Sequence, residues 1–144
     1  AKADLRLASA GAGKAARLAR LLGCRNVTFY LNLEEAGILA GRRFADAATA
    51  AAALLAMGAA RVLVTDGAGL CADGQSAEAT LTALPPKVAV HQLTGAGDTF
   101  MAAHIRAEQE GHGRAEALRL ALAAAGRYVS RQPGPGRDDQ QRET

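Results

Sequence analysis

The sequence predicts an α/β protein built on an open, mostly parallel β-sheet with helices on both faces. Two short segments, 26–31 and 61–67, are typical of buried strands, because they are rich in apolar and β-branched residues. Segments with apolar residues at helical spacing lie before, between and after them. This alternation is typical of the α/β class, and 144 residues suffice for one domain with its own core.

The expected helices are defined by caps and apolar spacing. The segment 14–22 is expected to be helical, with Gly23 as its stop. Asn32 is a candidate N-cap for a helix that ends at Gly41. Further helices are expected over about 46–57, after Gly97 and over about 114–130.

The remaining segments are less regular. From Leu70 to about Val90, short segments broken by Asp-Gly and Pro-Pro predict two or three small antiparallel strands. Residues 132–144 are polar and interrupted by proline, so we expect a disordered tail after a domain that spans 1–131. The segment 4–8 has weak strand character.

Composition argues against several classes of protein. Aromatic residues make up only 3% and Trp is absent, which argues against a base-stacking nucleic-acid surface. No apolar run is long enough to span a membrane. Cys24 and Cys71 form no C-x-x-C pair, so we expect reduced thiols in a cytoplasmic protein. The histidines lack the spacing of metal ligands.

Three polar segments fall where strands should end or helices begin, which is where open α/β sheets bind ligands. They are 32–35, 65–69 and 94–98. Each also has a structural explanation. Asn32 can cap a helix whose dipole Glu34 and Glu35 complement, 65–69 can be a plain turn, and Asp98 can be a first-turn acid.

The combination of segments resembles a known family. T-G-A-G-D-T-F at 94–100, preceded by V-L-V-T-D-G-A-G and N-L-E-E-A-G-I-L-A-G, is similar to the C-terminal half of the ribokinase-like (PfkB) carbohydrate kinases, over about 14–130. The resemblance implies part of a ribokinase-like sheet and an ATP-dependent phosphotransferase that uses Mg²⁺. The acceptor would be a hydroxyl of a sugar or nucleoside, and the run 84–105 looks most like pseudouridine-kinase-like members.

The resemblance also implies the roles of the glycine-rich loop. The amides of Gly95, Ala96 and Gly97 would form an anion hole, and Asp98 would be the catalytic base. Phosphoryl transfer depends on positioning and electrostatic stabilisation, and one fixed donor is typically worth about 3 kcal/mol of barrier.

The other two segments would bind the nucleotide and the metal. By resemblance, Asn32 and Glu35 form an N-x-x-E element that holds Mg²⁺ and phosphate largely through water, with Glu35 as the metal-side acid. Thr65 and Gly67 match a T-x-G turn beneath the nucleotide phosphates. The next glycine, Gly69, comes one residue earlier than in the family pattern.

Members of this family are longer, and the resemblance assigns the acceptor pocket and lid to an N-terminal half. We therefore expect this chain to be a C-terminal fragment, inactive alone, whose partners are that half and the small-molecule acceptor. No nucleic-acid or membrane partner is expected, and a homodimer stays open.

Two alternatives remain. The segment 11–16 fits G-x-G-x-x-A, with Glu34 at a tolerable distance, and would suit an NAD-binding Rossmann dehydrogenase if a strand preceded Gly11. A non-catalytic nucleotide-binding remnant is compatible with the same motifs as the kinase.

Overall fold

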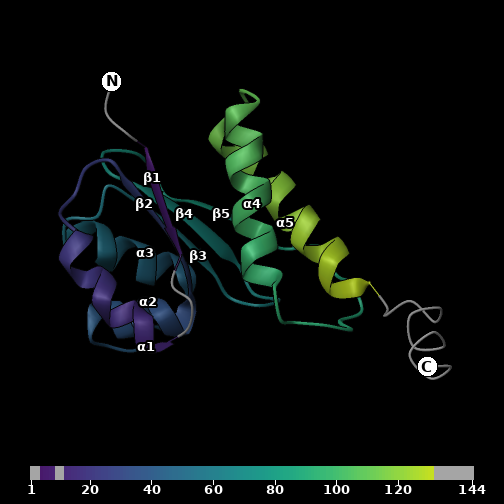
Figure 1. Ribbon diagram of the computed structural model, residues 1–144, viewed down its shortest axis with the longest axis horizontal. Coiled ribbons are helices and arrows are strands. Elements are labelled where there is room, and N and C mark those ends of the chain that lie inside the picture. Colours follow the sequence, from purple (N-terminus) through teal and green to yellow (C-terminus); the bar gives the residue numbers. More distant parts are fainter. Residues whose placement is uncertain (1–3, 9–11, 132–144) are drawn as a thin grey trace, which may run out of the picture.

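The computed structural model, which describes residues 4–8 and 12–131, contains one five-stranded sheet with the strand order β1-β2-β3-β4-β5 (Figure 1). The strands are β1 (Leu5–Ala8), β2 (Val27–Asn32), β3 (Arg61–Thr65), β4 (Cys71–Gln75) and β5 (Leu81–Ala83). The first three are parallel, and β4 and β5 continue the sheet in antiparallel pairing. The open sheet is therefore mixed, and the small antiparallel strands are confirmed. The expected tail at 132–144 lies outside the described residues.

Strand β1 differs from the sequence-based expectation, because the weak segment 4–8 contributes a full parallel strand. Its first backbone N–H donates to Asn26 O at 2.9 Å, and Leu5 pairs with Val27. Side chains alternate across the strand. Leu7 packs into the core on one face, whereas Arg6 bonds to Tyr30 on the other. The neighbouring strand and these contacts stabilise a segment with little strand propensity of its own.

One face of the sheet is covered by the helices of the first half of the chain. These are α1 (Ala12–Ala15), a 3₁₀ helix (Ala16–Leu21), α2 (Leu33–Ala40) and α3 (Ala47–Ala56). The expected helix at 14–22 is thus a short α-helix that continues as 3₁₀. Phe29, Val62 and Leu54 are buried in the core between these helices and the sheet.

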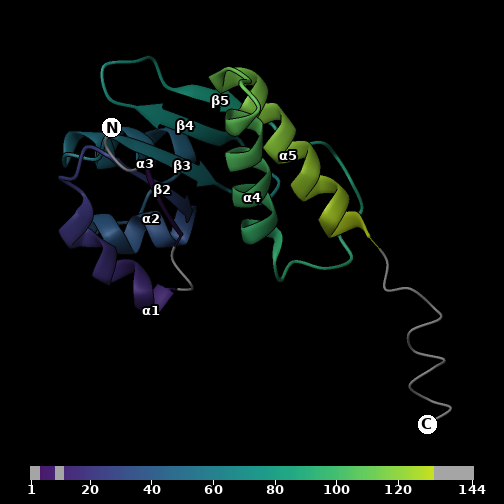
Figure 2. The ribbon, with the colours of Figure 1, turned by 45° about the horizontal axis from the view of Figure 1, so that its top comes forward.

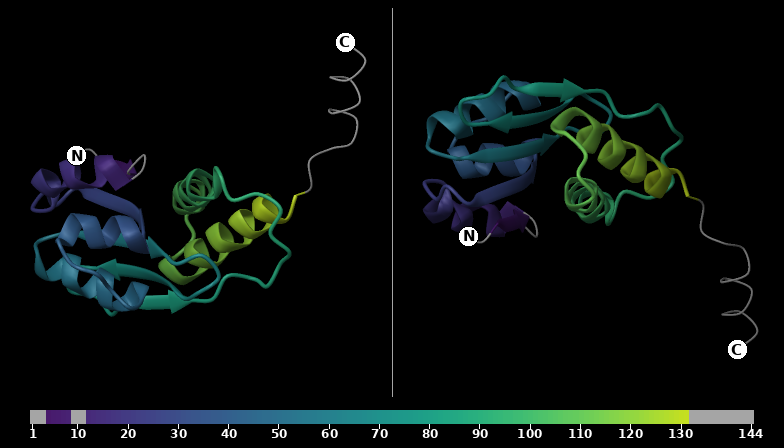
Figure 3. Two further views of the ribbon diagram at one scale, coloured as in Figure 1. Left: turned by 90° about the horizontal axis from the view of Figure 1, so that it is seen from below. Right: turned by 90° about the horizontal axis from the view of Figure 1, so that it is seen from above.

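Two long antiparallel helices, α4 (Ala96–Gln109) and α5 (Arg114–Ser130), cover the opposite face. Alternate strand residues point to this side, where Tyr30 and Leu63 pack against Phe100, Leu118 and Leu122. Figures 2 and 3 show this helix pair apart from α1–α3. The predicted arrangement of helices on both faces is confirmed. No helix in the described ranges has the combination of length and apolar character that crossing a membrane requires.

Candidate functional site

The first two polar segments lie side by side at the carboxyl ends of β2 and β3. Asn32, the last residue of β2, is the register partner of Thr65, the last residue of β3. Because the strands are parallel, the residues that follow them begin at the same edge of the sheet. This edge is the usual ligand-binding edge of open α/β sheets.

Asn32 and Glu35 form a reciprocal cap at the start of α2. Asn32 Oδ1 accepts from the Glu35 amide at 2.7 Å, and Glu35 Oε1 accepts from the Asn32 amide at 2.9 Å. The structural role considered for this segment is therefore present. The cap uses only one carboxylate oxygen, and Glu35 Oε2 has no hydrogen bond to any described residue.

The second segment forms a tight turn directly after β3. The Gly69 amide donates to Asp66 O at 2.7 Å, and Gly67 has a φ of 55°. A Cβ on Gly69 would lie 2.9 Å from Asp66 Oδ2, so a side chain there would disturb the turn. The main chain of the turn is open at Gly67, where a Cβ would meet no atom within 4 Å, whereas the Asp66 side chain lies against Gly69.

The third segment begins helix α4. Gly95 is the N-cap residue, with a φ of 93°, and its carbonyl accepts from the amide and the hydroxyl of Thr99 at 3.0 and 2.9 Å. The Ala96 amide donates to Leu93 O at 3.1 Å. By contrast, the amides of Gly97 and Asp98 have no backbone acceptor among the described residues, and both residues are exposed. The helix start therefore has free N–H groups and a partial positive charge.

Helix α4 runs antiparallel to the first three strands, which brings its start to the same edge. Near its other end, Glu108 contacts Arg61 at the amino end of β3. From Glu108 back to Asp98 the helix rises roughly 15 Å. From Arg61 to Thr65 the strand advances roughly 13 Å. Asp98 therefore lies about level with Thr65, as Figure 1 shows for the start of α4 and the tip of β3.

A charged cluster fixes the other end of α4 to the sheet. Glu108 accepts from Arg6 Nη1 at 2.7 Å and from Arg61 Nη1 at 2.8 Å, and all three side chains are largely buried. Arg61 also pairs at 3.0 Å with Asp73, which is completely buried and contacts Arg114 of α5. Burial alone would raise the pKa of Glu108, but the hydrogen bonds from Arg6 and Arg61 hold it below its ordinary value.

His104 belongs to the same cluster as a neutral group. Its Nδ1 lies 2.8 Å from Tyr30 Oη, and its ring is completely buried beside Phe100. Burial lowers the pKa of His104 to about 4. The sequence patterns do not predict this cluster. The one available signal is the spacing of Phe100, His104 and Glu108, which are four residues apart and therefore lie on one face of a helix.

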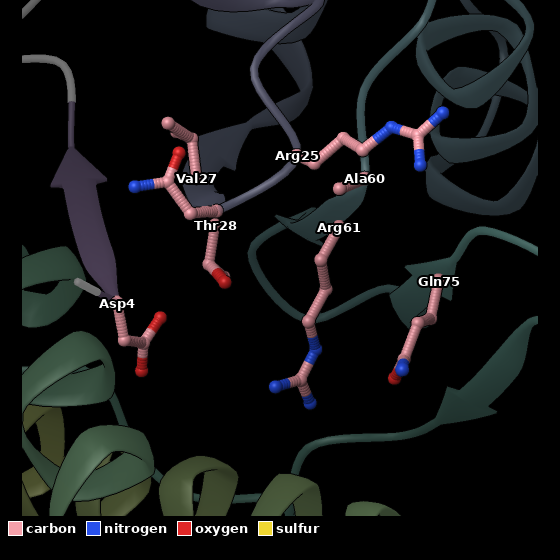
Figure 4. A pocket seen from close by; sticks show the side chains of 8 residues that line it. Asp4, Arg25, Val27, Thr28, Ala60, Arg61 and Gln75 are labelled. Carbon is pink, nitrogen blue, oxygen red and sulfur yellow. The ribbon is translucent and has the colours of Figure 1, made fainter. Parts of the chain in front are cut away.

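Two clefts lie on the described part of the molecule. One, of about 620 Å³, runs between α4 and α5 and is lined by Asp98 and Thr99 at one end and by Arg106 and Glu110 further along. The other, of about 420 Å³, lies at the amino ends of β2 and β3. In Figure 4 the side chains of Arg61 and Gln75 extend from its wall towards α4 and α5. Only the first cleft contains a residue of the three polar segments.

Metal binding at the site would depend on few protein ligands. Within the described residues there is no group of three or more His, Cys, Asp and Glu side chains arranged to hold a metal ion. The free oxygen of Glu35 is compatible with Mg²⁺, since this ion commonly keeps several waters and is bound through one or two carboxylates and substrate phosphates.

The capped acidic start of α2, the glycine turn after β3 and the glycine-rich start of α4 lie towards one edge of an open sheet. This arrangement is typical of α/β proteins that bind ligands at the carboxyl ends of their strands. The family model described as pfkB family carbohydrate kinase matches residues 6–137, so the chain belongs to this family. The match includes the segment 11–16 of the dehydrogenase alternative; β1 supplies a strand before this segment, and Gly11 lies outside the described residues.

Solved structures share the fold. A carbohydrate kinase from Agrobacterium tumefaciens is 29% identical, with a TM-score of 0.68 over 84% of this chain and 38% of its own. Adenosine kinase from Sinorhizobium meliloti is 20% identical, with a TM-score of 0.75 over 96% and 44%. Arabidopsis thaliana ribokinase, complexed with ribose and ATP, is 31% identical, with a TM-score of 0.65 over 75% and 35%. The chain thus spans less than half of each of these proteins. No curated protein matches it.

Proposed function

We propose that the protein is the ATP-binding part of a kinase that transfers the γ-phosphoryl group of ATP to a hydroxyl of a sugar or nucleoside. The observation that carries this proposal is the meeting of three elements at one edge of the sheet: the capped start of α2, the turn after β3 and the start of α4. Membership of the carbohydrate kinase family supports the reaction class. The ribose and ATP bound to the plant ribokinase support the choice of donor and acceptor.

In the proposed reaction, the start of α4 acts on the group in transfer. Asp98 takes the proton from the acceptor hydroxyl as its oxygen bonds to the γ-phosphorus and the bond to ADP breaks. The amides of Gly95, Ala96 and Gly97 stabilise the charge on the phosphoryl oxygens. The Gly95 and Gly97 amides are the available ones of the three, because neither has an acceptor among the described residues, whereas the Ala96 amide already donates to Leu93 O.

The other two segments hold the donor. We place the nucleotide phosphates over the turn formed by Thr65, Gly67 and Gly69, where the main chain is open to close approach at Gly67. Asn32 and the free oxygen of Glu35 would hold Mg²⁺ through water. Bound there, Mg²⁺ would neutralise phosphate charge.

We further propose that the acceptor pocket comes from a second half, as the greater length of the solved kinases suggests. Strand β1 pairs with β2 alone among the described residues, and Leu5 at its start is 43% exposed. Such an edge suits pairing with further strands. Because holding an acceptor in line can contribute about 7–11 kcal/mol to catalysis, we expect residues 1–144 alone to have no kinase activity.

The test is Asp98→Asn in the full-length protein, assayed for ADP formation with a panel of sugars and nucleosides. We expect turnover to fall by about 10²–10⁴-fold, because a general base is lost, while the affinity for ATP stays within a few-fold. Glu110→Gln, an exposed acid on the same helix, is the matched control and should keep full activity.

Other outcomes distinguish the alternatives. Turnover within a few-fold of wild type in the Asp98→Asn variant would remove Asp98 from the mechanism. A wild-type protein that binds ATP but phosphorylates no acceptor in the panel would favour a nucleotide-binding remnant. Binding of NADH without any response to ATP would contradict the kinase proposal altogether.

A further inference from the structure

Tyr128, near the end of α5, contacts the loop that begins α4. Its hydroxyl donates to Thr94 O at 2.5 Å, across 34 positions of the sequence. A Cβ built on Gly95 would lie 2.5 Å from Tyr128 Oη and 3.0 Å from Cζ. The tyrosine ring therefore packs directly on the bare backbone of Gly95. Figure 2 shows the segment before α4 passing beside the C-terminal end of α5.

This hydrogen bond determines the direction of a neighbouring N–H group. A trans peptide is planar, so the carbonyl of Thr94 and the amide of Gly95, which belong to one peptide unit, point in opposite directions. By holding Thr94 O, Tyr128 directs the Gly95 N–H away from α5. That N–H has no acceptor among the described residues, so it is available to a ligand.

The rest of the loop is attached to α5 by contacts that do not involve the hydroxyl. The amides of His91 and Gln92 donate to Val129 O at 2.7 and 3.2 Å, and Gln92 Nε2 donates to Tyr128 O at 2.8 Å. These bonds fix the loop up to Gln92. Within the described residues, the Tyr128 hydroxyl is the only group that bonds to Thr94 O, so its removal should free one peptide unit without detaching the loop.

We propose that Tyr128 is a positioning residue for the anion-binding loop, which it serves by orienting the Thr94–Gly95 peptide. The inference rests on the proposed function, because it requires the Gly95 amide to face a transferring phosphoryl group. A donor fixed in advance acts mainly in the transition state, where charge develops. Loss of its orientation should therefore lower kcat and leave the KM for ATP nearly unchanged.

The first test measures turnover of Tyr128→Phe in the full-length protein. This variant keeps the ring against Gly95 and removes only the hydroxyl. We expect kcat to fall about 10–100-fold, which is less than the loss of a whole donor, with the KM for ATP within about threefold. Ser130→Ala is the matched control, because it removes a hydroxyl from the same helix end whose acceptor is Arg127 O inside α5. It should leave both constants unchanged.

The second test is independent of catalysis. Residual dipolar couplings of the Gly95 amide, measured by NMR without ligand, report the direction of its N–H bond. We expect this coupling to change in Tyr128→Phe and not in Ser130→Ala, while the thermal midpoints of the three proteins stay close.

The outcomes separate the two proposals. An active wild-type protein whose Tyr128→Phe variant has an unchanged kcat, or an unchanged Gly95 coupling, overturns the role of Tyr128 and leaves the kinase proposal intact. A wild-type protein that transfers no phosphate overturns the proposed function, and the positioning role falls with it. If the thermal midpoint of Tyr128→Phe falls markedly together with kcat, the role of the tyrosine is only structural, and the inference is also refuted.

Discussion

Replacing Glu108 by glutamine should leave two largely buried arginines without their shared counter-charge. Breaking a buried ion pair typically costs about 3–5 kcal/mol, because the remaining charge stays desolvated. The side chains of Glu108, Arg61 and Arg6 are 17%, 12% and 17% exposed, so water screens them slightly, and glutamine can still accept one hydrogen bond. We therefore expect the lower end, about 3 kcal/mol, which for a domain of this size lowers Tm by roughly 10 °C.

Urea unfolding followed by circular dichroism measures this change, with Glu110→Gln as the control. Glu110 lies on the same helix but is half exposed, and its ion-pair partner, Arg106, is 3.8 Å away. Exposed pairs contribute little, so the control should change the free energy of unfolding by less than about 0.5 kcal/mol. If Glu108→Gln costs less than about 1 kcal/mol, the charged cluster does not hold α4 on the sheet.

Two further predictions concern His104 and Glu35. Burial lowers the pKa of His104 to about 4 in the folded protein, against about 6.5 when unfolded, so the unfolded state binds the extra proton between these values. The free energy of unfolding should therefore fall by about 3 kcal/mol in total as the pH drops from about 6.5 to 4. Unfolding curves of His104→Asn should lack this pH-dependent loss. If the variant shows the same pH profile as the wild type, His104 is not the titrating group. Glu35→Gln should keep the cap of α2, since glutamine serves at that position, but weaken Mg²⁺-dependent ATP binding measured by calorimetry. Unchanged metal dependence would limit Glu35 to its capping role.

Local patterns predicted those parts of the fold whose causes are local. Asn32 and Glu35 are three residues apart, and the cap they form depends on nothing further along the chain. The sheet edge where the segments meet follows from the general rule for parallel strands. Strand β1 could not be found in this way, because it depends on pairing with residues near position 27 and on the contacts of Arg6.

The two groups of contacts that position α4 depend on long-range packing. Arg6 and Glu108 are 102 positions apart, and Tyr128 and Thr94 are 34 apart. Neither pair forms a sequence motif, since arginine and glutamate are residue types found mostly at the surface and tyrosine is common in both environments. Only the folded arrangement shows that they act on the helix that carries Asp98.

The charged cluster also has a consequence for the order in which the chain folds. Its members come from β1, β3, β4, α4 and α5, and Arg114 donates to Asp73 O at 2.8 Å across 41 positions. Contacts between such distant segments form slowly, because the intervening chain must first lose its freedom. During synthesis on the ribosome, α4 has no complete docking surface until α5 has emerged. We therefore expect Asp98 to reach its place only after α5 has been translated.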